Sequence, residues 1–205
     1  MFAFFAGLAA GLLHVFSGPD HLAAVGPLAL SDSSTPQGHR TRVEGWRTGL
    51  QWGIGHTAGV LLIAALLLFL KDGLPLDAIS AYSERIVGVS LIGVGLWGVW
   101  KASRAVVQSH SHAGASFAIG TIHGLAGSSH LFGVLPALAF SSRADSITYL
   151  AGFGVGAIAG MCGFAAGVGL LSMRLGGHHH RRYQGFLYAA SAAALAIGGF
   201  WLVGR

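Results

Sequence analysis

The feature that most constrains this chain is a series of apolar stretches, each long enough to cross a lipid bilayer. A transmembrane helix needs about 20 predominantly apolar residues. Mean hydropathy is +0.65 and charged residues make up only 9% of the chain, which excludes an ordinary soluble domain. Six stretches qualify: 2–30, 47–70, 84–103, 115–140, 147–172 and 184–203. We therefore predict an all-α, polytopic membrane protein with six transmembrane helices in a single domain over 1–205.

The basic residues indicate topology and not a nucleic-acid partner. The formal net charge is +5, but Lys and Arg lie in short gaps between the apolar stretches and form no continuous stripe. Eight of them follow the first, third and fifth stretches, and four lie on the opposite side. Under the positive-inside rule the side with eight is cytoplasmic, so both termini are predicted to be extracytoplasmic. The Trp residues, mostly near the ends of the stretches, are expected to anchor at the membrane interfaces.

Two imidazoles and a carboxylate interrupt the first apolar stretch, as His14, Asp20 and His21. Ionisable groups at membrane depth are costly, so the cluster is a functional-site hypothesis, and no other acidic residue has such apolar surroundings. On a continuous helix the two histidines would lie about 10.5 Å apart along the axis. Gly18 and Pro19 predict a break that shortens this distance and begins a second half-helix. Asp20 then serves as a metal ligand or as the cap of that half-helix.

The fourth apolar stretch repeats the first at one constant offset, the one that separates His14 from His123. The residues His14, Gly18, His21, Leu22, Val25 and Pro27 correspond to His123, Gly127, His130, Leu131, Val134 and Pro136. Ser128 and Ser129 take the places of Pro19 and Asp20. Since three spans in each half force opposite orientations, we predict two inverted three-helix repeats, 1–105 and 113–205, with transmembrane helices 1 and 4 broken. Interrupted helices at corresponding positions indicate a binding site near the bilayer midplane.

The donor groups are those of a transition-metal site. Imidazole and carboxylate suit Zn, Ni, Co, Fe or Mn, whereas the single Cys162 offers no paired thiolates. His56, among glycines in the second stretch, is either a further ligand or a hydrogen-bonded core residue. Candidates for additional ligands or for the ion pathway are His123, His130, Ser128 and Ser129. Weaker candidates for loose metal capture, in gaps that could equally face lipid headgroups, are His110, His112, His178, His179 and His180.

A family resemblance follows from two segments. His14 with Asp20-His21-Leu22-Ala23-Ala24-Val25, and the glycine-rich run from Gly49 to Thr57 with His56 inside it, resemble the NicO/NiCoT nickel and cobalt transporters, above all their short, urease-associated six-span branch. The resemblance implies a bacterial inner-membrane transporter of Ni²⁺ or Co²⁺. It implies His14, Asp20 and His21 as the metal-contacting set with His56 contributing, and nickel-enzyme maturation factors or a second copy of the chain as partners.

The predicted function is therefore transport of a divalent transition-metal ion by alternating access, without enzymatic activity and without a tightly bound cofactor. Ni²⁺ and Co²⁺ are favoured, with Zn²⁺, Mn²⁺ and Fe²⁺ left open. No G-x-x-x-x-G-K-[ST] motif is present, so ATP-driven action would need a partner. Two alternatives stay open: a membrane electron carrier in which paired histidines ligate haem, and a membrane protein that binds metal without moving it.

Overall fold

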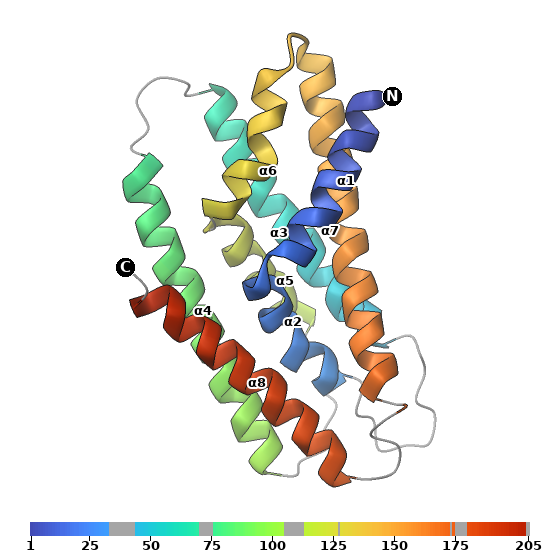
Figure 1. Cartoon of the computed structure of the whole chain (residues 1–205), viewed down its shortest axis with the longest axis vertical. Helices are drawn as coiled ribbons and strands as arrows, with labels where there is room; N and C mark the ends of the chain where they lie inside the picture. Colours follow the sequence, from blue (N-terminus) through green and yellow to red (C-terminus); the bar gives the residue numbers. More distant parts are fainter. Residues whose placement is uncertain are drawn as a thin grey trace.

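The computed structural model describes residues 1–32, 44–69, 76–104, 113–126, 128–172, 174 and 180–203, and these residues form eight α-helices and no strand (Figure 1). The all-α prediction is confirmed for this part of the chain. The helices are α1 (Phe2–Ser17), α2 (Pro19–Asp32), α3 (Glu44–Phe69), α4 (Leu76–Ser103), α5 (Ala113–Leu125), α6 (Ser128–Ala139), α7 (Arg143–Leu171) and α8 (His180–Val203).

The first expected span is broken at Gly18, where α1 ends and α2 begins. Gly18 has an extended backbone, with φ −93° and ψ 96°, and its N–H donates to the carbonyl oxygen of His14 at 3.1 Å. Pro19 follows as the first residue of α2, a position that requires no backbone N–H. The axes of α1 and α2 differ by 74°. The local sequence Gly-Pro thus produces both the end of one helix and the start of the next.

Four described helices are each long and apolar enough to cross a membrane, namely α3, α4, α7 and α8, and α1 with α2 would form a fifth, bent crossing. The fourth expected span, 115–140, corresponds to the shorter helices α5 and α6, and Gly127 between them lies outside the described residues. In Figure 1 the chain direction alternates: α1 and α2 run downward, α3 upward, α4 downward, α5 and α6 upward, α7 downward and α8 upward.

Small residues let the helices approach closely. α1 packs along α7, and α3 packs between α5 and α7 (Figure 1). A Cβ added at Gly7 would collide with the carbonyl oxygen of Tyr149, and one at Gly59 would lie only 2.7 Å from that of Thr121. Close backbone contact at small residues is typical of helix packing in membranes, where lipid provides no hydrophobic force between helices.

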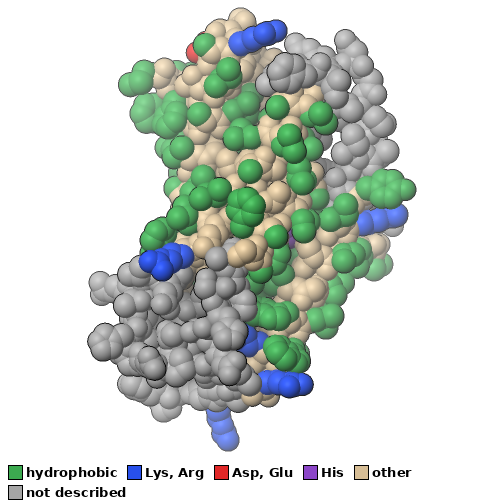
Figure 2. Space-filling model, turned by 180° about the vertical axis from the view of Figure 1, so that it is seen from behind, with side chains coloured by type: hydrophobic (Ala, Val, Ile, Leu, Met, Phe, Trp, Pro, Cys, Tyr) green, Lys and Arg blue, Asp and Glu red, His purple; other side chains and the backbone are tan. Residues whose placement is uncertain are grey.

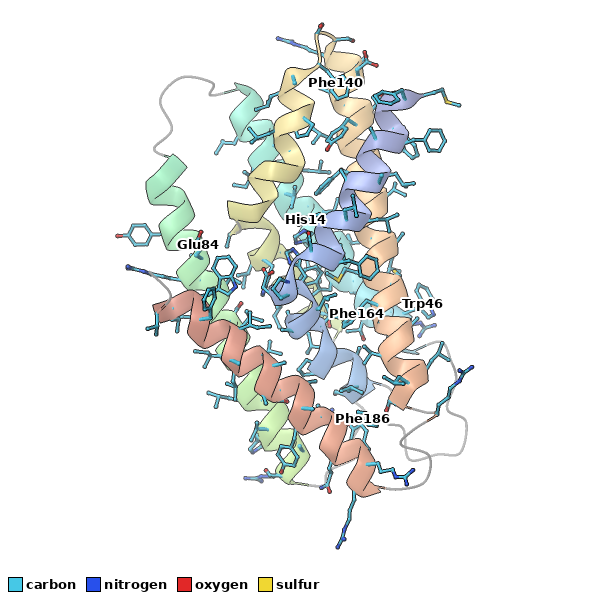
Figure 3. The ribbon with its side chains drawn as sticks, in the orientation of Figure 1. His14, Trp46, Glu84, Phe140, Phe164 and Phe186 are labelled. Atoms are coloured by element: carbon cyan, nitrogen blue, oxygen red, sulfur yellow. The ribbon has the colours of Figure 1, made fainter. Side chains whose placement is uncertain are left out.

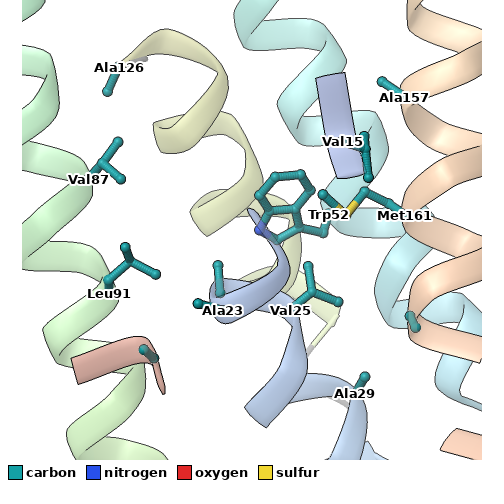
Figure 4. Close-up of a cluster of buried hydrophobic side chains, with 13 residues drawn as sticks. Val15, Ala23, Val25, Ala29, Trp52, Val87, Leu91, Ala126, Ala157 and Met161 are labelled. Carbon is teal, nitrogen blue, oxygen red and sulfur yellow. The ribbon is translucent and has the colours of Figure 1, made fainter. Parts of the chain in front are cut away.

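Many large apolar side chains lie on the described outer surface. They include Leu13, Phe16, Leu62, Val89 and Leu96, and Figure 2 shows hydrophobic side chains over much of the described part of one face, with a few Lys and Arg side chains among them. A largely apolar exterior of this kind fits contact with lipid better than contact with water. The main buried apolar cluster, with Trp52, Leu91 and Met161 among its members, lies beneath this surface (Figure 4).

Candidate metal centre

The break between α1 and α2 brings His14 and His21 together. His14 lies in the last turn of α1 and His21 in the first turn of α2. Their ring centroids are 4.8 Å apart and the rings meet edge to face, at 86°. A straight helix would hold these residues two turns apart. The bend at Gly18 therefore converts a sequence separation of two helical turns into a direct contact between imidazoles in the interior of the bundle (Figure 3).

His56 adds a third imidazole from α3. Its ring stacks on His14, with centroids 5.5 Å apart at 19°, and meets His21 at 4.9 Å. One nitrogen from each of the three rings can be chosen so that all three lie within 4.8 Å of one another. Nitrogen ligands at about 2.0–2.1 Å around a tetrahedral ion are roughly 3.4 Å apart. The three imidazoles are thus within side-chain rotation of a shared ion, and the structure brings together three of the four main predicted ligands.

Asp20 contacts the imidazole of His21 beside it. Oδ1 of Asp20 lies 3.0 Å from Nδ1 of His21, and both side chains are buried. A carboxylate accepts hydrogen bonds, so this contact makes Nδ1 the protonated nitrogen and directs the lone pair of Nε2 away from Asp20. Carboxylate–histidine pairs of this geometry orient metal-binding histidines and raise the basicity of the imidazole. Asp20 is therefore placed to act on a metal through His21.

Aromatic rings hold the imidazoles in place. Trp52, fully buried, stacks on His56 with centroids 4.8 Å apart at 12°, and Phe153 lies 5.4 Å from His14. The prediction that Trp52 anchors at an interface is wrong, because the residue lies inside the bundle. Trp52 and His56 are four residues apart, one helical turn on the same face of α3, and this spacing is the sequence signal that could have predicted their contact.

His123 occupies a separate position behind this cluster. Its Nδ1 donates to the carbonyl oxygen of Ile119 at 3.0 Å, and its ring lies 5.7 Å from Trp52 and 6.4 Å from His21. His123 is fully buried. His123 thus lies next to the cluster of His14, His21 and His56 but is not part of it.

The remaining predicted residues fall mostly outside the described part of the chain. Ser128, Ser129 and His130 form the first turn of α6, but their side chains are not described. His110, His112, His178 and His179 lie outside the described residues, and of His180 only the backbone, at the start of α8, is described. Asp20 is not the only buried acidic residue among those described: Glu84 on α4 is also buried, and Figure 3 shows it well separated from His14.

Comparison with known proteins finds two relatives in Arabidopsis thaliana. The chain is 43% identical over 97 residues to Chloroplast protein FOR GROWTH AND FERTILITY 2 and 40% identical over 97 residues to Chloroplast protein FOR GROWTH AND FERTILITY 1. The match covers 47% of this chain but only 24% of each relative. No family model and no solved structure matches the chain.

These relatives correct two predictions. The assignment to the nickel and cobalt transporter family is wrong, since the relatives found are the two chloroplast proteins and no model of any family matches. The predicted location, a bacterial inner membrane with extracytoplasmic termini, is also wrong, because both relatives are plant chloroplast proteins. The short motif around the helix break therefore does not by itself identify a family.

Proposed function

We propose that this protein moves a divalent transition-metal ion across a membrane, with His14, His21 and His56 as the ion's ligands. The observation that carries the proposal is the convergence of three buried imidazoles from α1, α2 and α3 at a helix break. Intramembrane ionisable groups mark ion pathways by default. Three imidazoles with a nearby carboxylate suit borderline ions such as Zn²⁺, Co²⁺ and Ni²⁺ better than Mg²⁺ or Ca²⁺.

A carrier of this kind needs a site that can be released, and the broken helix supports that role. His14 and His21 belong to different helices that meet at Gly18, so a change of the angle between α1 and α2 separates two of the three ligands. A permanently structural metal site would favour ligands on rigid elements. The site does not suit haem, because the three imidazole rings contact one another directly and leave no space between them for a porphyrin.

The proposal includes two inverted three-helix repeats, 1–105 and 113–205, and reciprocal contacts support this. A Cβ at Gly11 of α1 would collide with the carbonyl oxygen of Phe153 on α7, and one at Gly120 of α5 would collide with that of Trp52 on α3. Gly11 and Gly120 are related by the same offset as His14 and His123. The neighbouring ring pairs correspond too, since His14 lies beside Phe153 and His123 beside Trp52.

Two further sets of contacts follow the same pattern. A Cβ at Gly156 would collide with the carbonyl oxygen of Leu8, and one at Gly55 with that of Phe117, which is the repeat equivalent of Leu8 at the same offset. In the outer pair of helices, a Cβ at Gly88 of α4 would lie 3.0 Å from the oxygen of Gly198 of α8, and one at Gly198 would lie 2.9 Å from the oxygen of Gly88. These pairs are what a pseudo-twofold axis relating α1–α4 to α5–α8 predicts.

Transport of metal into proteoliposomes tests the function. The purified chain should accumulate Co²⁺, Zn²⁺ or Ni²⁺ inside vesicles, measured by elemental analysis after external ions are removed. His14→Ala, His21→Ala and His56→Ala should each abolish uptake, while Ser116→Ala, which removes a buried hydroxyl from α5, should retain it. Folded histidine variants that transport at the normal rate would refute the proposal. A chain that binds ions tightly in detergent but never moves them would be the metal-binding, non-transporting alternative.

A further inference from the structure

A cavity of about 440 Å³ opens beside the break between α1 and α2. Its walls include Leu13, Ser17, His14 and Asp20 from the broken helix, with Gly133 from α6 and Trp201 from α8 opposite. Leu13 and Ser17 are exposed, whereas His14 and Asp20 are buried, so the cavity leads from the surface toward the metal cluster. Its volume accommodates on the order of ten waters at about 30 Å³ each. Trp201, predicted to be an interface anchor, lines this cavity instead.

The repeat relation identifies the equivalent place in the other half. Ser17 corresponds to Ala126 and Gly133 to Ala24 at the offset that relates His14 to His123. Trp201 corresponds to Leu91, since each lies three residues after the reciprocal glycines Gly198 and Gly88.

The two places differ in how they are filled. Ser17 is exposed, and Gly133 and Trp201 are partly exposed, but Ala126, Ala24 and Leu91 are all buried. These three belong to one apolar cluster together with Ala23 and Val87. Figure 4 shows Ala126 near Val87, and Leu91 directed toward Ala23. Among the described residues, these three that line the cavity are thus exposed or partly exposed, while their counterparts in the other half are packed inside the apolar cluster.

We propose that the cavity beside the α1–α2 break is the path by which an aqueous ion reaches the three histidines, and that Val87, Leu91 and Ala126 form the closed gate of the opposite path. This inference rests on the proposed function. Alternating access requires one open and one closed path at any time, and packed apolar side chains exclude both water and ions. His21 and His56, both fully buried, lie behind His14 and Asp20 on this path.

Cysteine accessibility tests the proposal at two positions that the repeat makes equivalent. Cys162 is the single native cysteine, so Cys162→Ala gives a clean background. Ser17→Cys and Ala126→Cys are then treated in detergent with a charged, water-soluble methanethiosulfonate, which reacts with thiolates in contact with water. Ser17→Cys should react at least tenfold faster than Ala126→Cys, and saturating Co²⁺ should slow its reaction. Leu96→Cys, on the exposed surface of α4, is the lipid-facing control and should react slowly.

The possible outcomes separate failure of the proposed path from failure of the proposed function. If calorimetry shows that the protein binds Co²⁺ but Ser17→Cys does not react, or reacts equally with and without Co²⁺, the proposed path is refuted and the metal site survives. Equal reaction rates at Ser17→Cys and Ala126→Cys would refute the closed gate. A protein that binds none of Co²⁺, Zn²⁺ and Ni²⁺ refutes the proposed function, and the path with it.

A second variant probes the gate itself. Leu91→Ala shortens a fully buried side chain of the gate and should raise the reaction rate of Ala126→Cys severalfold. Val94→Ala, at another buried position of α4, is the matched control and should leave that rate unchanged. Equal effects of the two substitutions would mean that Leu91 does not close a path. Thermal unfolding of each protein identifies variants that react only because they are unfolded.

Discussion

Replacing Asp20 with Asn tests how the carboxylate acts on the site. The substitution keeps the shape of the side chain but removes the charge that faces Nδ1 of His21 at 3.0 Å. Loss of an outer carboxylate partner of a metal-binding histidine costs about 10–100-fold in metal affinity. We therefore expect Co²⁺ to bind Asp20→Asn with a free energy weaker by about 1.4–2.7 kcal/mol. Burial of both partners keeps solvent from replacing the carboxylate, which favours the upper half of this range.

Calorimetric titration with Co²⁺ measures the change directly, and thermal unfolding gives an independent readout. At a Co²⁺ concentration 100 times the Kd of the wild type, bound metal stabilises the protein by about 2.7 kcal/mol. A variant with 100-fold weaker affinity would gain only about 0.4 kcal/mol at the same concentration. Asp145→Asn, the same chemical change at an exposed acidic residue in the first turn of α7, should alter neither value.

Two outcomes would refute the reasoning. An unchanged Kd in Asp20→Asn would mean that the contact with His21 has no effect on the metal. A loss far beyond about 100-fold, in a protein that still folds, would exceed what an outer partner contributes and would make Asp20 a direct ligand.

Three other predictions concern packing, ring orientation and pH. Gly11→Ala should destabilise the protein by about 1–3 kcal/mol, because the added Cβ meets a backbone carbonyl oxygen of α7. The control Gly93→Ala should not destabilise it, because a Cβ there has no neighbouring atom within 4 Å. Equal shifts in the melting temperatures of the two variants in detergent would contradict this. Trp52→Phe should keep the Co²⁺ affinity within a few-fold of the wild type, because a phenyl ring can still stack on His56. Trp52→Leu should weaken Co²⁺ binding more. Equal Kd values for the two variants would exclude a role of the ring in positioning His56. Sufficient acid should weaken Co²⁺ binding, since protons compete with the ion for the imidazole nitrogens. Calorimetric titrations at falling pH measure this, and a Kd that does not rise before the protein unfolds would contradict it.

The relation between sequence and structure is clearest at the helix break. Gly18-Pro19 acts locally, through the missing N–H of proline and the missing Cβ of Gly18, which would collide with the imidazole of His21, so the end of α1 and the start of α2 could be read from the sequence. The apolar stretches are equally local, because hydropathy and length decide whether a helix can enter a membrane. Of the predicted ligands, His14 and His21 needed only this break to be placed together.

Contacts between distant segments could not be read in the same way. Whether His56 faced the cluster or the core stayed open, because the sequence alone does not fix the rotation and crossing angle of α3 against α1 and α2. Trp52 and Trp201 looked like interface anchors for the same reason, since a position near the end of an apolar stretch does not say which side of the helix meets a neighbour. The tertiary structure placed one against His56 and the other in the wall of the cavity.

The sequence by itself thus determined the all-α class of the fold, the helix break at Gly18 and the pair of histidines on its two sides, because each depends on residues within a few helical turns of one another. Only the tertiary structure decided the third imidazole, the aromatic rings around it and the cavity beside the helix break. These depend on how helices from remote parts of the chain pack, and close packing of glycines against the backbone carbonyl oxygens of neighbouring helices leaves each helix little freedom to rotate.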